Sequence, residues 1–98
     1  MQITLNDKMY IAPAPKGRMV RRAFEIVENI NLEHMKVTDL DSLIAYVVEL
    51  FGNKFTIDDV YDGLPAAELM PTVMGCINTV VGAMGGKLEQ FPNGQTEA

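Results

Sequence analysis

The stretch FGNKFTIDDVYDGLP, residues 51–65, contains three aspartates, two of them adjacent. Thr56 precedes Asp59 by three residues, which is the spacing of a capping box at a helix N-terminus. The two adjacent aspartates then fall in the first turn, where the helix dipole favours negative charge. Gly63 can end this helix, and Pro65 can start the next one. The stretch therefore predicts a short helix between two longer helices.

The same aspartates can be compared with a calcium loop of the EF-hand type. That loop needs oxygen ligands at alternate positions and a bidentate glutamate at its twelfth position. Counted from Asp58, the third position is Val60 and the twelfth is Leu69, and neither side chain carries an oxygen. Because Pro65 also lies inside the loop, we favour the capping interpretation and expect no metal site.

Outward from this stretch, a second helix is predicted before Gly52 and Asn53, which suit a left-handed C-terminal stop. Thr38 or Asp39 could cap its N-terminus. Its apolar residues recur at helical spacing. They are Leu40, Leu43, Ile44, Val47, Leu50 and Phe51.

Residues 18–30 predict an earlier helix of the same periodic kind. Its apolar stripe comprises Met19, Ala23, Ile26, Val27 and Ile30.

A last helix carries apolar residues from Leu69 to Met84. Proline is tolerated only in the first turn, so Pro71 predicts that this helix begins near Leu69 or else kinks. Three glycines are expected to end the helix, because glycine is a poor helix former. They are Gly82, Gly85 and Gly86.

At the N-terminus, residues 3–5 and 9–12 flank Asn6 and Asp7, residue types that tolerate a tight hairpin turn. We therefore expect a mainly α (α+β) fold, with a short β-hairpin followed by about four helices packed as a small bundle. Residues 1–86 would form one domain. The polar, aperiodic residues 87–98 would form a disordered, flexible tail.

The composition excludes several classes of function. The net charge of −5 argues against a nucleic-acid partner, since phosphate contacts need a basic surface. The N-terminus does not resemble a signal peptide, and no apolar stretch is long enough to span a membrane. The single cysteine, Cys76, cannot form an internal disulfide, and with one histidine it cannot complete a zinc site. We expect a cytoplasmic protein without a cofactor.

Catalytic chemistry has little to build on in this sequence. Cys76 lies among apolar residues, and no base near it in sequence could activate it. Asp41-Ser42-Leu43 at the start of an acidic helix resembles the prosthetic-group site of acyl carrier proteins. The helix after Ser42 is shorter than in those proteins, and this chain begins with a hairpin. We expect no enzyme, and an acyl-carrier-like protein modified on Ser42 remains an alternative.

With catalysis, metals and cofactors disfavoured, we expect the protein to function by binding a partner through its surface. A basic segment containing Arg18, Arg21 and Arg22 is either a solvated helix face or a docking patch. Seven methionines suit either core packing or adaptable binding, and Met70 and Met74 are candidates for the latter. Asp62 is a further candidate contact.

Residues 51–82 resemble the small tail assembly chaperones of siphophages and prophages of Gram-positive bacteria. The resemblance rests on the run FGN-FT-DD-YDGL, the following proline and CIN, and the earlier RRAFEI, residues 21–26. It covers roughly residues 1 to 86.

The resemblance implies a chaperone that coats the tape-measure protein, helps recruit tail-tube subunits, including the major tail protein, and is absent from the mature virion. It also implies a frameshift-extended form, and Gly86-Lys87 can be encoded by a slippery run of purines. Self-association into a homo-oligomer and a role as a structural tail component are further hypotheses.

Overall fold

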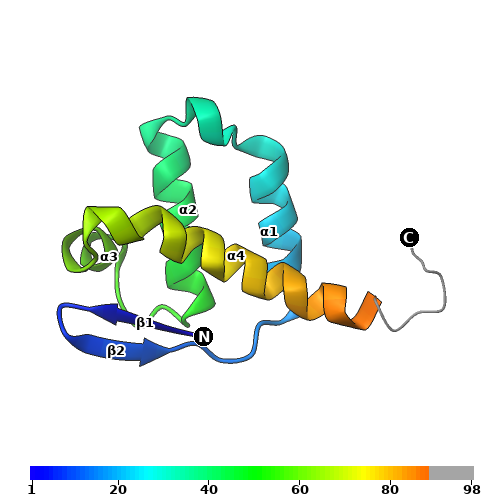
Figure 1. The fold of residues 1–98 in the computed structure, drawn as a ribbon, viewed down its shortest axis with the longest axis horizontal. Helices are drawn as coiled ribbons and strands as arrows, with labels where there is room; N and C mark the ends of the chain where they lie inside the picture. Colours follow the sequence, from blue (N-terminus) through cyan, green and yellow to red (C-terminus); the bar gives the residue numbers. More distant parts are fainter. Residues whose placement is uncertain (89–98) are drawn as a thin grey trace.

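The computed structural model describes residues 1–88 of the chain as a two-stranded hairpin followed by four α-helices (Figure 1). The elements are β1 (Gln2–Leu5), β2 (Lys8–Ile11), α1 (Gly17–Asn29), a 3-10 turn η1 (Leu32–His34), α2 (Val37–Leu50), α3 (Ile57–Gly63) and α4 (Ala66–Leu88). This order confirms the predicted fold class. The predicted tail lies almost entirely outside the described residues.

The hairpin has the predicted turn. Asn6 and Asp7 have φ angles of 50° and 69°, which are the two left-handed residues of a type I′ turn. The strands pair antiparallel, with Ile3 opposite Tyr10. Ile3 and Leu5 of β1 are buried, so one face of the hairpin packs on the helices.

Helix α2 is the centre of the fold. It packs against α1 on one side and α3 on the other, and α4 crosses both α1 and α2 (Figure 1). Among the side chains whose burial is described, more of the core comes from α2 than from any other element. Its buried residues are Leu43, Ile44, Tyr46, Val47, Val48 and Leu50.

The caps predicted in residues 51–65 are present. The Asp59 backbone N–H donates to Thr56 Oγ1 over 3.1 Å, and the Thr56 N–H donates to the Asp59 carboxylate over 2.9 Å. Gly52 and Asn53 follow α2 with φ angles of 80° and 60°. The aspartate-rich stretch is therefore confirmed as the start of a helix.

The N-terminus of α2 differs from the prediction. The helix begins at Val37, and Lys36 occupies the cap position instead of Thr38 or Asp39. The Asp39 carboxylate lies in the first turn and accepts a hydrogen bond from the Lys36 N–H over 3.0 Å. The acid satisfies the N–H of Lys36 and lies at the positive end of the helix dipole, while no side chain that the structure describes accepts from the first-turn N–H groups.

Helix α4 starts directly after Pro65, as residues 51–65 predicted, but the expected start near Leu69 and the expected stop at the glycines were wrong. It begins at Ala66, where the Glu68 N–H donates to the carbonyl of Pro65, so Pro71 lies inside the helix. Proline there leaves one carbonyl without a helical partner. The helix continues past Gly82 and includes Gly85 and Gly86. Glycine lowers helix stability without forcing an end, so these glycines were poor stop signals.

The hairpin is seated on the end of α3. The Asn6 N–H donates to the carbonyl of Gly63 over 3.4 Å. A Cβ placed on Gly63 would lie 2.9 Å from Leu5 Cβ and 3.2 Å from Leu5 Cα. The ring of Tyr10 packs edge-on against Phe55, with 4.8 Å between centroids. Glycine at this position lets the strand approach the helix backbone.

Candidate partner-binding surfaces

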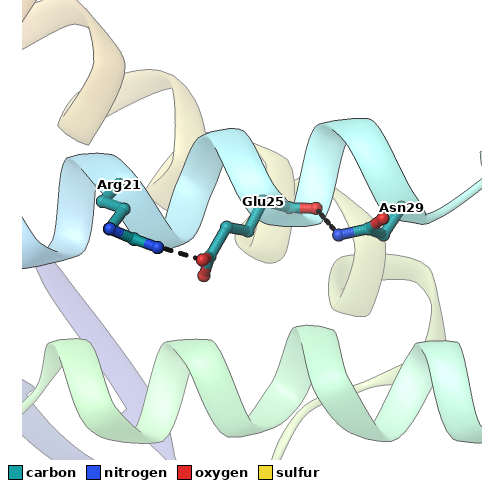
Figure 2. Close-up of polar contacts among 3 residues, drawn as sticks. All are labelled: Arg21, Glu25 and Asn29. Atoms are coloured by element: carbon teal, nitrogen blue, oxygen red, sulfur yellow. Dashed lines mark hydrogen bonds and ion pairs between the residues drawn. The ribbon is translucent and has the colours of Figure 1, made fainter.

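The predicted basic segment lies on α1, but two of its three arginines are in ion pairs. Arg21 contacts Glu25 one turn later over 3.2 Å, and both side chains are exposed (Figure 2). Arg22 forms an ion pair with Glu49 of α2. Arg18 is exposed and has no side-chain hydrogen bond or ion pair within residues 1–88. Of the three, Arg18 offers the least compensated positive charge.

Two hollows of about 300 and 260 Å³ share Arg22 in their linings; the first lies against α2, Asn53 and Ile57, and the second forms a groove between α1 and α2. On the α1 side, the Asn29 amide donates to the carbonyl of Glu25 over 2.8 Å (Figure 2). On the α2 side, Ser42 donates its hydroxyl to the carbonyl of Thr38 over 3.0 Å. The groove has mixed charge, and much of its hydrogen-bonding capacity is used internally.

Ser42 lies in the second turn of α2, since the helix begins at Val37. This position differs from the helix N-terminal serine that the carrier alternative requires. No observation in the structure favours a prosthetic group on this side chain.

The two candidate methionines lie on α4, half-buried against the core. Met74 reaches a small apolar hollow between α1 and α4, which we call the α1–α4 cleft. The cleft has a volume of about 60 Å³ and a lining of Ile26, Val27, Ile30, Leu32, Leu43, Met74 and Ile77. Met70 and Met74 are therefore partly core and partly accessible surface.

Asp62 is exposed on α3, at the opposite side of the molecule from α1 (Figure 1). The structure therefore does not bring it together with the three arginines. Any contact made by Asp62 belongs to a separate surface.

Several of the most exposed apolar side chains were not selected from the sequence, and Val27, which the sequence placed on the packed stripe of its helix, is exposed instead. On α1, Phe24 is 44% exposed and Val27 is 62% exposed, and Leu32 of η1 is 48% exposed. On the outer face of the hairpin, Met9 and Ile11 are 54% and 65% exposed. The sequence could have indicated that α1 has exposed apolar residues. Phe24 lies beyond the predicted stripe, so the apolar residues of α1 span a wider arc than one packed face can bury.

The ionisable groups in the interior have structural roles. Tyr46 donates its hydroxyl to the carbonyl of Met19 over 3.1 Å, and burial raises its pKa to about 12. Burial also raises the pKa of the Cys76 thiol to about 11. A raised thiol pKa lowers the thiolate fraction that a nucleophile needs.

A second tyrosine joins α3 to α2 at the surface. Tyr61 donates to Asp41 Oδ1 over 2.5 Å, and desolvation followed by this hydrogen bond raises its pKa to about 12. Within residues 1–88, no three His, Cys, Asp or Glu side chains converge as a metal site. None of the helices in that range combines the length and apolar character that a membrane crossing needs.

The family model described as phage tail chaperone protein matches residues 1–96. No curated protein and no solved structure matches the chain. The match covers nearly the whole sequence, including the hairpin, all four helices and the Phe51–Pro65 stretch. The chain therefore belongs to the phage tail chaperone protein family, a family of non-enzymatic assembly chaperones.

Proposed function

We propose that this chain is a tail assembly chaperone that binds the tape-measure protein of its phage and helps recruit the major tail protein around it. The family match over residues 1–96 carries this proposal. The protein acts in the host bacterial cytoplasm and is absent from the mature virion. The resemblance to proteins from siphophages and prophages of Gram-positive bacteria supports a host of that group.

The α4 side of the α1–α4 cleft is the proposed contact for an apolar helix face. Met74 lines the cleft and Met70 is half-buried one turn earlier on the same helix, and methionine adapts to partner side chains of different shapes. A helix laid into such a groove is held by apolar residues at helical spacing. Masking apolar segments in this way would keep a long, aggregation-prone partner in solution.

The arginines would add charge contacts beside the cleft. Arg18 is uncompensated within residues 1–88, while Arg21 and Arg22 must leave Glu25 and Glu49 to meet a partner. Exposed ion pairs contribute little, so Arg21 can exchange its partner at small cost. Asp62 would serve a separate contact on α3.

Co-expression with the tape-measure protein encoded in the same phage genome tests the function. We expect the tape-measure protein to be insoluble alone, soluble with this chain, and recovered with it from a tag on either protein. Mass spectrometry of purified virions should not detect this chain. An insoluble tape-measure protein in the presence of the folded chain would contradict the proposal, and the chain in virions would instead indicate a structural tail component.

Matched variants test the surface. Met74→Glu places a charge in the apolar cleft and should reduce the recovery of tape-measure protein. Val37→Glu, at a side chain that is 76% exposed on α2, adds the same charge elsewhere and should leave recovery unchanged. Circular dichroism confirms that both variants fold. Equal recovery with both variants would exclude the cleft while leaving the function intact.

A frameshift-extended form of this chain is part of the proposal. The codons for Gly86 and Lys87 would contain a slippery run of purines. A nucleotide sequence without such a run would exclude this site of frameshifting.

A further inference from the structure

Helix α1 has an apolar stripe beside its core-facing side: Val20 touches the core at one end, and Val27 lies at the edge of the α1–α4 cleft at the other. Its members recur at four and three residues, so they lie along one face of the helix. They are Val20, Phe24 and Val27, which we call the α1 outer stripe. Phe24 and Val27 are 44% and 62% exposed, and Val20 is half-buried.

Two opposite charges flank the α1 outer stripe on the same side. Arg21 and Glu28 are seven residues apart, which is two helical turns, and both are exposed. Glu28 has no ion pair within residues 1–88. Arg21 contacts Glu25, but such an exposed pair within one helix contributes little to stability. Both charges are available to a second helix.

The arrangement is complementary to itself. When two identical helices pair antiparallel, a two-fold axis relates them, and positions at equal distances on either side of the centre meet. With the centre near Phe24, Val20 of one copy meets Val27 of the other. Arg21 of one copy then faces Glu28 of the other, and the symmetry repeats this ion pair.

We propose that this chain forms a homodimer in which the α1 outer stripes of two copies pack antiparallel, with reciprocal ion pairs between Arg21 and Glu28. The occupant of the stripe is therefore a second copy of the chain. A different partner helix would need an acidic residue opposite Arg21 and a basic residue opposite Glu28. A second copy of α1, running antiparallel, supplies both by symmetry. The stripe is short, so the dimer is weak and depends on concentration, as is usual for small interfaces.

Cysteine cross-linking tests the geometry. Phe24→Cys is introduced together with Cys76→Ala, because Cys76 is the only thiol in the unmodified chain. Mild oxidation should produce a disulfide-linked dimer, since the two introduced thiols meet at the symmetry axis. Val37→Cys in the same background is the control, as an exposed α2 position outside the stripe. Equal cross-linking of both variants, or of neither, would overturn the proposal.

Charge exchange provides a second test that keeps the apolar stripe intact. Arg21→Glu or Glu28→Arg alone replaces both ion pairs with repulsions and should weaken the dimer by about tenfold or more, as measured by analytical ultracentrifugation. An equimolar mixture of the two variants can form a heterodimer in which both repulsions are relieved by pairing opposite charges. The mixture should therefore dimerise better than either variant alone.

A monomeric unmodified chain up to millimolar concentration would overturn the proposal, as would a mixture that dimerises no better than the separate variants. Thermal unfolding of each variant establishes that its monomer is folded. These experiments use the purified chain alone. Their outcome is therefore independent of whether the chain binds the tape-measure protein.

Discussion

Replacing glycine with alanine should have opposite effects at two positions of this chain. At Gly75, in the middle of α4, an added Cβ meets nothing within 4 Å. Alanine is favoured over glycine in a helix interior by about 0.5–1 kcal/mol, so Gly75→Ala should stabilise the isolated protein by that amount. At Gly63, the added Cβ would lie 2.9 Å from Leu5 Cβ.

The overlap at Gly63 cannot be relieved by rotating a side chain. The neighbouring atoms include Leu5 Cα at 3.2 Å and the Asn6 nitrogen at 3.4 Å, so the hairpin backbone must move. Overpacking of this kind costs about 1–3 kcal/mol. Gly63 is the last residue of α3, where the helical gain from alanine is small. The expected net effect of Gly63→Ala is a destabilisation of about 1–2 kcal/mol, obtained by setting these two terms against each other.

Urea unfolding followed by circular dichroism measures both changes. For a domain of this size, about 1 kcal/mol corresponds to a change of roughly 4–8 °C in Tm, so thermal unfolding resolves the two directions. The Tm should fall for Gly63→Ala and rise for Gly75→Ala. If Gly63→Ala stabilised the protein as much as Gly75→Ala, the close seating of the hairpin on α3 would be refuted.

Three further experiments test the surroundings of single side chains. Thr56→Ala should destabilise the protein by about 1 kcal/mol in urea unfolding, because it removes the cap acceptor of α3; an unchanged midpoint would contradict the role of this cap. The pKa of Tyr46 is raised from 10.0 to about 12, so its contribution to stability is complete below pH 10 and is lost as the pH rises towards 12. Stability measured across that window should therefore fall less steeply in Tyr46→Phe than in the unmodified chain, and equal slopes would argue against a folded-state shift. The pKa of Cys76 is raised from 9.0 to about 11, so the folded chain at pH 8 should react with a thiol reagent about a hundredfold more slowly than the urea-unfolded chain. Comparable rates would show that the thiol is accessible.

Local signals predicted local structure well in this chain. The turn at Asn6 and Asp7 and the reciprocal contacts of Thr56 and Asp59 each depend on residues within three positions of one another. Such contacts are determined by backbone sterics and by short side chains near their own main chain. The sequence therefore contained enough information to place them.

Helix boundaries that depend on packing were predicted less well. Pro71 and Gly82 both weaken a helix, yet α4 continues through them because buried residues such as Val73 and Val80 hold it against the core. Tertiary burial can outweigh a local cost of about 1 kcal/mol for glycine or about 3 kcal/mol for proline. The stabilisation from burial cannot be predicted from the sequence of α4 alone, because it depends on where the neighbouring helices pack.

The candidate surface was only partly accessible to prediction. The sequence identified the arginines, but the ion pair between Arg22 and Glu49 joins residues 27 positions apart. Its existence depends on how α1 and α2 pack, which periodicity alone does not specify. Exposure of Phe24 likewise depends on which part of a wide apolar arc meets the core.

The seating of the hairpin on α3 has a consequence for synthesis of the chain on the ribosome. Leu5 is translated before Gly63, which completes its contact and follows 58 residues later. At about 5–20 residues per second, translation separates the two by roughly 3–12 s. During that interval the hairpin has no α3 on which to dock, and Ile3 and Leu5 remain uncovered by their final contacts. The hairpin is therefore translated well before the helix that completes its native environment.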